Sequence, residues 1–319
     1  MGLRLCFGRV EASLLYHPRR YKDQELLPDS VWQLGAQLYA SEKLSYSVRN
    51  WRGSSFPQSA LLLKPQSGDV DVLWVLFGGN AMLATDWLPF CTRLLTARGA
   101  SPKLPGVAFL LVDYPGYGSN LGEPTPGSIL KGSCEAIRAA LRQIKGSTVG
   151  SPEIHLLGHS LGAAAAAQLA AAGRSQGIPA ARLILSAPFI DIPQMAMQLL
   201  GSLPPPKSCL PEQLQPLGSW LGQTLWRLLP VFLSWTLPHV WSNTHSVRKA
   251  AKDGWRVAIV HGARDEIVPF FMGRTLWQEA DAAGSEDSPA VFVEVPQAGH
   301  NDVVLAALPE YARLMGLAT

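Results

Sequence analysis

Three residues far apart in the sequence have side chains that together could carry out nucleophilic catalysis. Ser160 is the centre of GHSLG, Asp265 lies in HGARDEIVP and His300 lies in VPQAGHND. A serine hydroxyl is a poor nucleophile until a base takes its proton, and an acid must hold that base in the right tautomer. With Ser160 as nucleophile, His300 as base and Asp265 as acid, the chemistry would be attack on an acyl carbon.

The segment around Ser160 has the pattern Gly-x-Ser-x-Gly between a strand-like run, IHLL, and a run rich in alanine. In this pattern a sharp turn from strand to helix holds the serine in a strained conformation, with its hydroxyl raised above the sheet edge. Gly158 and Gly162 are needed because side chains there would collide with neighbouring backbone. The alternative is a serine that only caps a helix at a tight turn.

The base and the acid each have competitors. We choose His300 because its glycine-flanked loop follows the last predicted strand, whereas His159 lies inside the elbow and should point away from the line of attack. Asp265 follows a strand, with Glu266 as the fallback acid and Asp191 as a second location. The other histidines are treated as structural or without catalytic context: His17, His155, His239, His245 and His261.

Two backbone amides are expected to hold the negative charge that develops on the substrate oxygen, forming an oxyanion hole. The amide of Leu161, directly after the nucleophile, is one. The second should come from FGGNAM, where Gly78 and Gly79 allow close approach and Asn80 is the expected donor, with Ala81 left open as the alternative. Taken alone, GGN is better explained as a plain turn.

These residues need a sheet whose strand ends lie together. Short runs dense in Val, Ile and Leu alternate with helix-like segments, which predicts an α/β fold with a mostly parallel sheet and helices on both faces. Two earlier runs, LSYSVRNW and SALLLKP, are expected to be antiparallel leading strands. The predicted parallel strands are 71–77, 107–114, 153–158, 181–188, 255–262 and 290–296, and the predicted helices are 88–98, 128–144, 160–172, 271–283 and 303–314.

The composition is that of a globular protein with one large core. The chain has 319 residues, 47% hydrophobic and 16% charged, so a single domain over 1–319 is expected. The net charge of +3 is small and indicates no nucleic-acid partner. The four cysteines are far apart without metal-binding spacing, and no nucleotide or metal motif occurs, so no cofactor and no metal are expected.

The N-terminal segment is a poor signal peptide, because Arg4, Arg9 and Glu11 break its apolar run. No apolar stretch free of charge reaches about 18 residues, so no clear transmembrane span is expected. The basic cluster HPRRYK is expected at a solvated edge, with contact to an anionic membrane surface as the alternative. A cytoplasmic or peripheral membrane location is expected, and the oligomeric state stays open.

One stretch breaks the alternation of strands and helices. Residues 191–249 contain no strand-like run but many large apolar residues, and we expect a helical cap inserted into the domain. Ordinary packing of the cap on the body is the simplest role for its apolar side chains. They could also line a channel for an acyl chain or touch a membrane.

With these segments in view, the chain resembles the α/β-hydrolase superfamily over 71–314, through FGGNAM, DYPGYGSNLGEPT, GHSLG, HGARDEIVP and AGH. The DYPGYG turn is similar to that of an ABHD-type branch with lysophospholipase-like and depalmitoylase-like members. The chain departs from that branch at Gly78, where a histidine is usual, and in its longer insertion. The resemblance implies an α/β-hydrolase fold and the triad Ser160, Asp265 and His300, and it does not choose a substrate.

The expected function is that of a serine hydrolase of the esterase, lipase or thioesterase kind. It would act on a small-molecule or lipid-like carboxylic ester or thioester with a medium or long acyl chain, through an acyl-enzyme intermediate. Amide or peptide hydrolysis and acyl transfer to an acceptor other than water are alternatives on the same triad. A non-catalytic binding protein on the hydrolase scaffold is the third.

Overall fold

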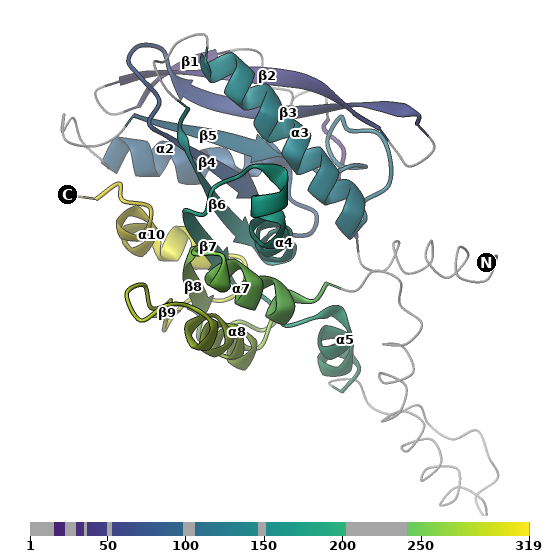
Figure 1. The fold of residues 1–319 in the computed structure, drawn as a ribbon, viewed down its shortest axis with the longest axis vertical. Coiled ribbons are helices and arrows are strands. Elements are labelled where there is room, and N and C mark those ends of the chain that lie inside the picture. The colour runs from purple at the N-terminus through teal and green to yellow at the C-terminus, as the bar shows by residue number, and fades with distance from the viewer. Residues whose placement is uncertain are drawn as a thin grey trace, which may run out of the picture.

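The computed structural model describes residues 16–22, 30–34, 37–49, 53–97, 106–145, 151–201 and 241–318. Within them a nine-stranded sheet runs through the centre of the molecule in the order β1-β2-β3-β5-β4-β6-β7-β8-β9 (Figure 1). Helices cover both faces of this sheet. This is the α/β architecture predicted from the alternation of strand-like and helix-like segments.

Strands β4 to β9 form the parallel part of the sheet. Phe77 at the end of β4 pairs with Gly158 of β6, so the turns that follow these two strands lie side by side. All six strands were predicted, with bounds that differ by one or two residues. They are β4 Val72–Phe77, β5 Val107–Val112, β6 Glu153–His159, β7 Arg182–Ser186, β8 Arg256–Gly262 and β9 Val291–Val295.

The antiparallel edge of the sheet holds one strand more than predicted. The two leading strands are β2, Gln37–Arg49, and β3, Ser55–Pro65, and β1, Ser30–Leu34, pairs with the outer side of β2. The sequence of β1 is SVWQL, and Val31 within it is 53% exposed. An edge strand of this kind lacks the continuous apolar run that marks the buried strands, which is why it was missed.

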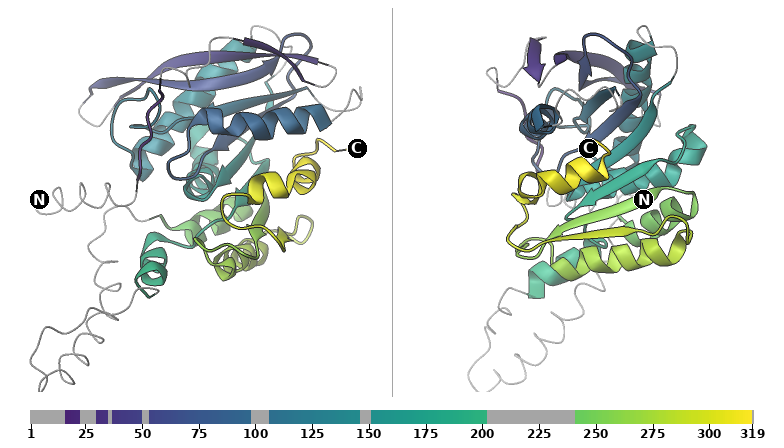
Figure 2. Two further views of the ribbon diagram at one scale, coloured as in Figure 1. Left: turned by 180° about the vertical axis from the view of Figure 1, so that it is seen from behind. Right: turned by 90° about the vertical axis from the view of Figure 1, so that its left-hand side faces the viewer.

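Both faces of the parallel strands are buried, with successive residues pointing to opposite sides. In β4, Leu73, Val75 and Phe77 belong to one hydrophobic core, whereas Trp74 and Leu76 belong to the other. The first core lies under α3 Pro126–Lys145, α4 Leu161–Gln176, α7 Asn243–Lys252 and α8 Phe270–Ala283, and the second under the 3-10 helix η2 Ala84–Trp87, α2 Leu88–Ala97, α9 Val303–Ala306 and α10 Leu308–Leu314 (Figure 2).

The C-terminal helix predicted over 303–314 is two helices in the structure. Ala307 separates α9 from α10 and has φ −102° and ψ 29°, outside the helical region. Pro309 follows in the first turn of α10, where it has no amide hydrogen to continue the bonding pattern of α9. The prediction of one continuous helix was therefore wrong.

The predicted cap over 191–249 lies only partly within the described residues. It begins with α5, Ile192–Gly201, whose first turn is capped by Asp191, since its Oδ1 accepts a 2.7 Å hydrogen bond from the amide of Gln194. At its other end, α7 packs on α4 and α8 and covers the sheet. Residues 202–240 lie outside the described residues.

Candidate active site

The loops that follow the parallel strands bring the predicted site residues together at the carboxyl edge of the sheet. Ser160 follows β6, Asp265 lies in the loop after β8 and His300 in the loop after β9. A Cβ built on Gly79, in the loop after β4, would lie 3.5 Å from the Cβ of Ser160. The rings of His159 and His300 have centroids 4.9 Å apart, so the loops after β4, β6 and β9 meet at one place.

Ser160 occupies a backbone conformation that serine rarely adopts, with φ 54° and ψ −115°. Its amide donates a 2.9 Å hydrogen bond to the carbonyl of Ser186, and its carbonyl accepts one of 3.0 Å from the amide of Ala163. These bonds hold the sharp turn between β6 and α4 in place. Strain of this kind costs about 1–3 kcal/mol and persists where the surrounding structure enforces it.

The two glycines of GHSLG allow the close packing around this turn. A Cβ on Gly158 would lie 2.0 Å from the carbonyl oxygen of Gly162, and one on Gly162 would lie 2.0 Å from that of Phe77. Both obstacles are backbone atoms, which cannot rotate away as a side chain can. The structure therefore gives a steric reason for glycine at both positions.

We expect Gly162→Ala to lower the free energy of unfolding by about 3 kcal/mol or to prevent folding, because the added methyl overlaps backbone. Gly127→Ala is the matched control. Nothing lies within 4 Å of a Cβ there, and the residue sits in the first turn of α3, so its stability should be unchanged or slightly raised. Urea denaturation measures both. Wild-type stability of Gly162→Ala would contradict the close approach of α4 to β4.

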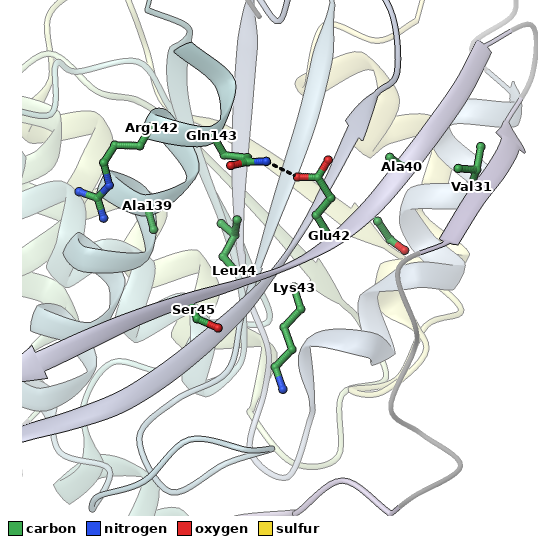
Figure 3. A pocket seen from close by; sticks show the side chains of 10 residues that line it. Val31, Ala40, Glu42, Lys43, Leu44, Ser45, Ala139, Arg142 and Gln143 are labelled. Carbon is green, nitrogen blue, oxygen red and sulfur yellow. Dashed lines mark hydrogen bonds between the residues drawn. The ribbon is translucent and has the colours of Figure 1, made fainter. Parts of the chain in front are cut away.

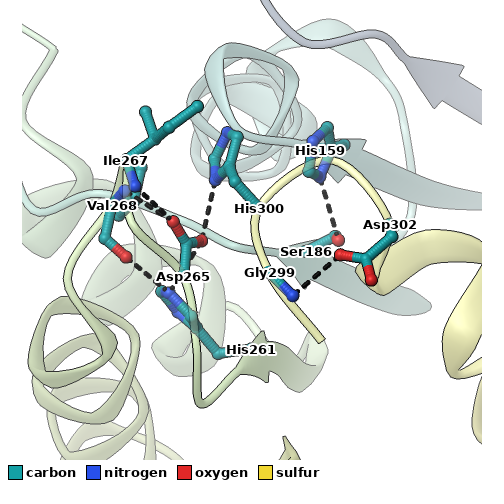
Figure 4. A network of polar contacts seen from close by, with 9 residues as sticks. All are labelled: His159, Ser186, His261, Asp265, Ile267, Val268, Gly299, His300 and Asp302. Carbon is teal, nitrogen blue, oxygen red and sulfur yellow. Dashed lines mark hydrogen bonds and ion pairs between the residues drawn. The ribbon is translucent and has the colours of Figure 1, made fainter. Parts of the chain in front are cut away.

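Asp265 and His300 form a buried hydrogen-bonded pair, with Oδ2 and Nδ1 2.7 Å apart (Figure 4). Oδ1 of Asp265 accepts hydrogen bonds from the amides of Ile267 (2.9 Å) and Val268 (2.7 Å). The two side chains are 0% and 5% exposed. When Nδ1 of His300 donates to the carboxylate, its Nε2 is left as an acceptor, which is the tautomer that a general base requires.

A second histidine, His261, also contacts this carboxylate. Its Nε2 lies 2.9 Å from the carbonyl oxygen of Val268 and 3.3 Å from Oδ2 of Asp265. Because a carbonyl oxygen only accepts, Nε2 carries the hydrogen, which is shared between the oxygens of Val268 and Asp265. Nδ1 has no hydrogen-bond partner among the described residues and faces Gly273, where a Cβ would lie 2.2 Å away. The sequence did not indicate this contact, because His261 lies at the end of β8 and only the fold of the following loop brings its Nε2 to Asp265.

The surroundings of Asp265 favour its ionised form. Burial alone would raise the pKa of this carboxyl, but the hydrogen bonds from His261 and His300, with that from the Val268 amide, outweigh burial and hold the pKa well below its usual range. The carboxylate is therefore negative at neutral pH and matched to a histidine that becomes positively charged during a reaction.

His159 lies beside the ring of His300 rather than in solvent. Its Nδ1 is 3.1 Å from Oγ of Ser186, and burial lowers its pKa to about 3, with His300 acting in the same direction. His159 is thus neutral at physiological pH and packs against His300 without adding charge. Sequence reasoning gave it no supporting role, although its place next to the nucleophile in GHSLG was a usable signal.

The two other acids considered from the sequence, Asp191 and Glu266, make no hydrogen bond to His300 within the described part of the chain. Asp191 caps α5, and Glu266 is exposed, with its Oε2 2.9 Å from the place where a Cβ on Gly299 would lie. Asp302 accepts a 2.7 Å hydrogen bond from the amide of Gly299 and so steadies the loop that carries His300. Of the acids weighed, the structure brings Asp265 to the base.

The loop after β4 uses several of its amides internally. Gly79 donates to Sδ of Met82 (3.0 Å), Ala81 to the side-chain oxygen of Asn80 (3.1 Å) and Met82 to the carbonyl of Gly79 (3.2 Å). These bonds argue against Ala81 as the oxyanion donor and keep Asn80 as the candidate. Leu161 is the first residue of α4, so its amide has no carbonyl one turn earlier in the helix to bond to.

Two tyrosines of the DYPGYG turn form hydrogen bonds with this loop. The hydroxyl of Tyr114 donates a 2.6 Å hydrogen bond to the carbonyl of Gly78, and that of Tyr117 donates one of 2.8 Å to Oδ1 of Asn80. Sequence reasoning used the turn only for its resemblance to a family. The two tyrosines, three residues apart, are the part of it that reaches the candidate oxyanion loop.

Residues 16–22, which we call the strap, also lie against these loops. Arg19 forms an ion pair with Asp86 (2.9 Å), and the hydroxyl of Tyr21 donates a 2.7 Å hydrogen bond to Asp113. Most of this basic cluster is exposed, as expected of a solvated edge, but Arg19 and Tyr21 are half-buried and bonded to the body of the domain. Its partners lie more than sixty residues away in sequence, and nothing in the local pattern indicates them.

A separate groove of about 670 Å³ lies between β2 and α3 (Figure 3). Glu42 in its wall accepts a 2.8 Å hydrogen bond from Gln143 and pairs with Lys64 at 3.2 Å. None of the predicted site residues lines it. The groove therefore does not change where the candidate active site lies.

The part of the chain that the structure describes contains no group of three or more His, Cys, Asp or Glu side chains arranged to hold a metal ion. In that same part, none of the helices has the length and apolar character needed to cross a membrane. Cys91 and Cys134 are free, buried thiols.

Comparison with known proteins places these features in a wider setting. A model described as "Alpha/beta hydrolase family" matches residues 74–314. An uncharacterized protein of Mycobacterium tuberculosis, found in two strains, is 33% identical over 198 residues, which are 62% of this chain. The matched part is 54% of that protein, so the chain spans about half the length of the curated relatives it matches.

Solved structures share the fold at low sequence identity. A variant of the rice cell wall degrading esterase LipA from Xanthomonas oryzae superposes with a TM-score of 0.54 and 16% identity, covering 88% of this chain and 91% of that one. Esterase Pf2001 of Pyrococcus furiosus superposes with a TM-score of 0.52 and 13% identity, covering 86% and 90%. At these identities the likeness concerns the fold.

Proposed function

Because the chain belongs to the alpha/beta hydrolase family, we propose that it is a serine hydrolase that cleaves a carboxylic ester or thioester. The observation that carries the proposal is the 2.7 Å hydrogen bond between buried Asp265 and His300, whose ring centroid lies 4.9 Å from that of His159, the residue before the strained Ser160. A buried carboxylate–imidazole pair next to a strained serine is the arrangement that activates a hydroxyl for acyl transfer.

In the proposed reaction, Oγ of Ser160 attacks the carbonyl carbon and Nε2 of His300 takes the hydroxyl proton. The carboxylate of Asp265 keeps the imidazole oriented and offsets its positive charge. The amides of Leu161 and Asn80 stabilise the oxygen of the tetrahedral intermediate. His300 then gives its proton to the leaving alcohol or thiol. In the second half of the reaction His300 deprotonates a water that attacks the acyl carbon, and the proton passes from His300 to Oγ of Ser160 as the carboxylic acid leaves.

For the substrate we propose a medium or long acyl chain. The supporting observation is in the sequence, where residues 191–249 carry many large apolar side chains beyond those needed to join two strands. Burying an alkyl chain against such side chains contributes about 0.8 kcal/mol per methylene. Each added methylene should therefore raise kcat/KM by roughly fourfold until the apolar surface is filled.

The test is a series of p-nitrophenyl esters from acetate to decanoate, run beside the matching p-nitroanilides. We expect turnover of the esters, with kcat/KM rising from acetate to a medium chain, and much slower turnover of the anilides. A steady fall from acetate to decanoate would contradict the acyl-chain part of the proposal. Turnover of the anilides but not the esters, or of neither, would contradict the ester or thioester assignment itself.

A further inference from the structure

The strap is joined to the candidate oxyanion loop through both polar atoms of one side chain, that of Asn80. Its Oδ1 accepts hydrogen bonds from the amide of His17 (2.8 Å), the hydroxyl of Tyr117 (2.8 Å) and the amide of Ala81 (3.1 Å). Three donors at this atom identify it as the oxygen, so the other atom is Nδ2. Nδ2 lies 2.7 Å from Nδ1 of His17 and donates to it.

His17 therefore presents one donor and one acceptor to Asn80. Because Nδ1 accepts, the hydrogen of the neutral ring is on Nε2. The two bonds add to that from Tyr117 in holding the side chain of Asn80. They span 63 residues of sequence, so they do not arise from local chain geometry.

The strap holds the far end of the same loop as well. Both terminal nitrogens of Arg19 bond the carboxylate of Asp86 at 2.9 and 3.0 Å, and Oδ2 of Asp86 also accepts a 2.9 Å hydrogen bond from the amide of Leu83. Bidentate pairing of this kind fixes direction as well as distance. The strap thus acts on the loop at Asn80 and, through Asp86, at Leu83.

Tyr21 completes the attachment through Asp113. The carboxylate of Asp113 accepts 2.7 Å from the hydroxyl of Tyr21 and 2.8 Å from the amide of Ala84, the residue after the loop. Burial raises the pKa of Asp113 to about 6. The strap is thus attached at three of its residues, His17, Arg19 and Tyr21, to groups at or beside the loop.

We infer that the strap is a positioning element for the oxyanion hole, with His17 acting through Asn80. This inference rests on the proposed function, in which the Asn80 amide stabilises the tetrahedral intermediate. The loop contains Gly78, Gly79 and Ala81 at φ 62°, and a segment with this backbone needs outside contacts to hold one orientation. Oxyanion donors are effective only when they are oriented before charge develops.

The test compares His17→Ala with His17→Asn, using p-nitrophenyl ester hydrolysis and the rate of phosphonylation by a fluorophosphonate. Asparagine carries its Oδ1 on Cγ, as histidine carries Nδ1, so it restores the acceptor for Asn80 Nδ2 without restoring the ring. We expect His17→Ala to lower kcat and the phosphonylation rate about tenfold with KM within twofold, and His17→Asn to recover most of the loss. His245→Ala, an exposed histidine on α7, should match the wild type.

Three outcomes would overturn the inference. An unchanged kcat in His17→Ala would show that the strap does not position the loop, and an equal loss in His17→Asn would show that the acceptor does not matter. A rise in KM at unchanged kcat would indicate a role in substrate binding instead. A wild-type chain that neither hydrolyses esters nor reacts with the probe would overturn the proposed function, and the inference with it, and this result is distinct from the other three.

Discussion

Ser160→Ala is expected to lower kcat/KM for p-nitrophenyl esters by at least about 10⁴-fold and to abolish reaction with a fluorophosphonate probe. The hydroxyl oxygen is the atom that bonds to carbon or phosphorus, and alanine has none there. The two backbone hydrogen bonds of residue 160, from its amide to the carbonyl of Ser186 and from the amide of Ala163 to its carbonyl, do not involve the side chain. The elbow should therefore keep its shape, and the free energy of unfolding should change little.

The matched control is Ser175→Ala on the same helix. Ser175 is exposed and its hydroxyl donates a 2.7 Å hydrogen bond to the carbonyl of Ala172. It should keep wild-type hydrolysis and labelling. Peptide mass spectrometry of the labelled wild type should place a single adduct on Ser160, and an adduct on another serine would refute Ser160 as the nucleophile.

Asp265→Asn is expected to lower kcat/KM by about 10⁴-fold. Oδ1 accepts from the amides of Ile267 and Val268, so it stays the oxygen of the new amide and the NH₂ group replaces Oδ2. That NH₂ then donates to Nδ1 of His300, which places the ring hydrogen on Nε2. A histidine with hydrogen on Nε2 cannot take the proton of Ser160. The NH₂ group also faces the Nε2 hydrogen of His261, where two donors meet.

Glu266→Gln is the control for this variant. It makes the same chemical change one residue further along an exposed part of the loop, and activity should stay within about twofold of the wild type. Steady-state kinetics and circular dichroism of both variants separate loss of catalysis from loss of fold. If Glu266→Gln loses activity and Asp265→Asn keeps it, the assignment of the acid is wrong.

The same substitution should change how stability depends on pH. The pKa of Asp265 is lower in the folded chain than in the unfolded one, so its carboxylate stabilises the fold at pH values above the unfolded value, about 3.9. That contribution is lost as pH falls through the lower folded-state pKa. The Asn variant has no such carboxylate, so its unfolding free energy should fall less steeply on acidification.

Much of the fold could be predicted because the parallel strands are buried on both faces. Runs such as VLWVLF and VAFLLV are apolar at every position, which is typical of a short strand covered by helices on both sides. Their order along the chain then determines which loops share the carboxyl edge. The elbow was equally predictable, since Gly158 and Gly162 have a steric reason that follows from the turn itself.

The parts that could not be predicted are contacts between distant segments with weak local patterns. β1 is an edge strand of five residues, and the division between α9 and α10 depends on one proline. His261 reads from the sequence as the end of a strand, and only the folded loop brings its Nε2 to Asp265. The strap is largely exposed, as predicted, but its contacts could not be predicted, because a run of basic residues does not indicate which distant carboxylates and carbonyls it will bond.

Burial of both strand faces also determines how each strand finds its pairing register. A strand with one polar face cannot slip by one residue, because the slip would turn apolar side chains into water. In β4 that penalty is absent, since both faces are apolar. The two faces of β4 differ instead in the volume of their side chains and of those they pack against. Leu73 and Val75 share their core with the alanines at 163–167 of α4, whereas Trp74 shares the opposite core with Trp87 and Phe90. A one-residue slip would turn the indole of Trp74 toward the alanine-rich face of α4, where it does not fit. Side-chain size therefore selects the register. Substitutions that conserve size should be tolerated better here than those that conserve hydrophobicity alone.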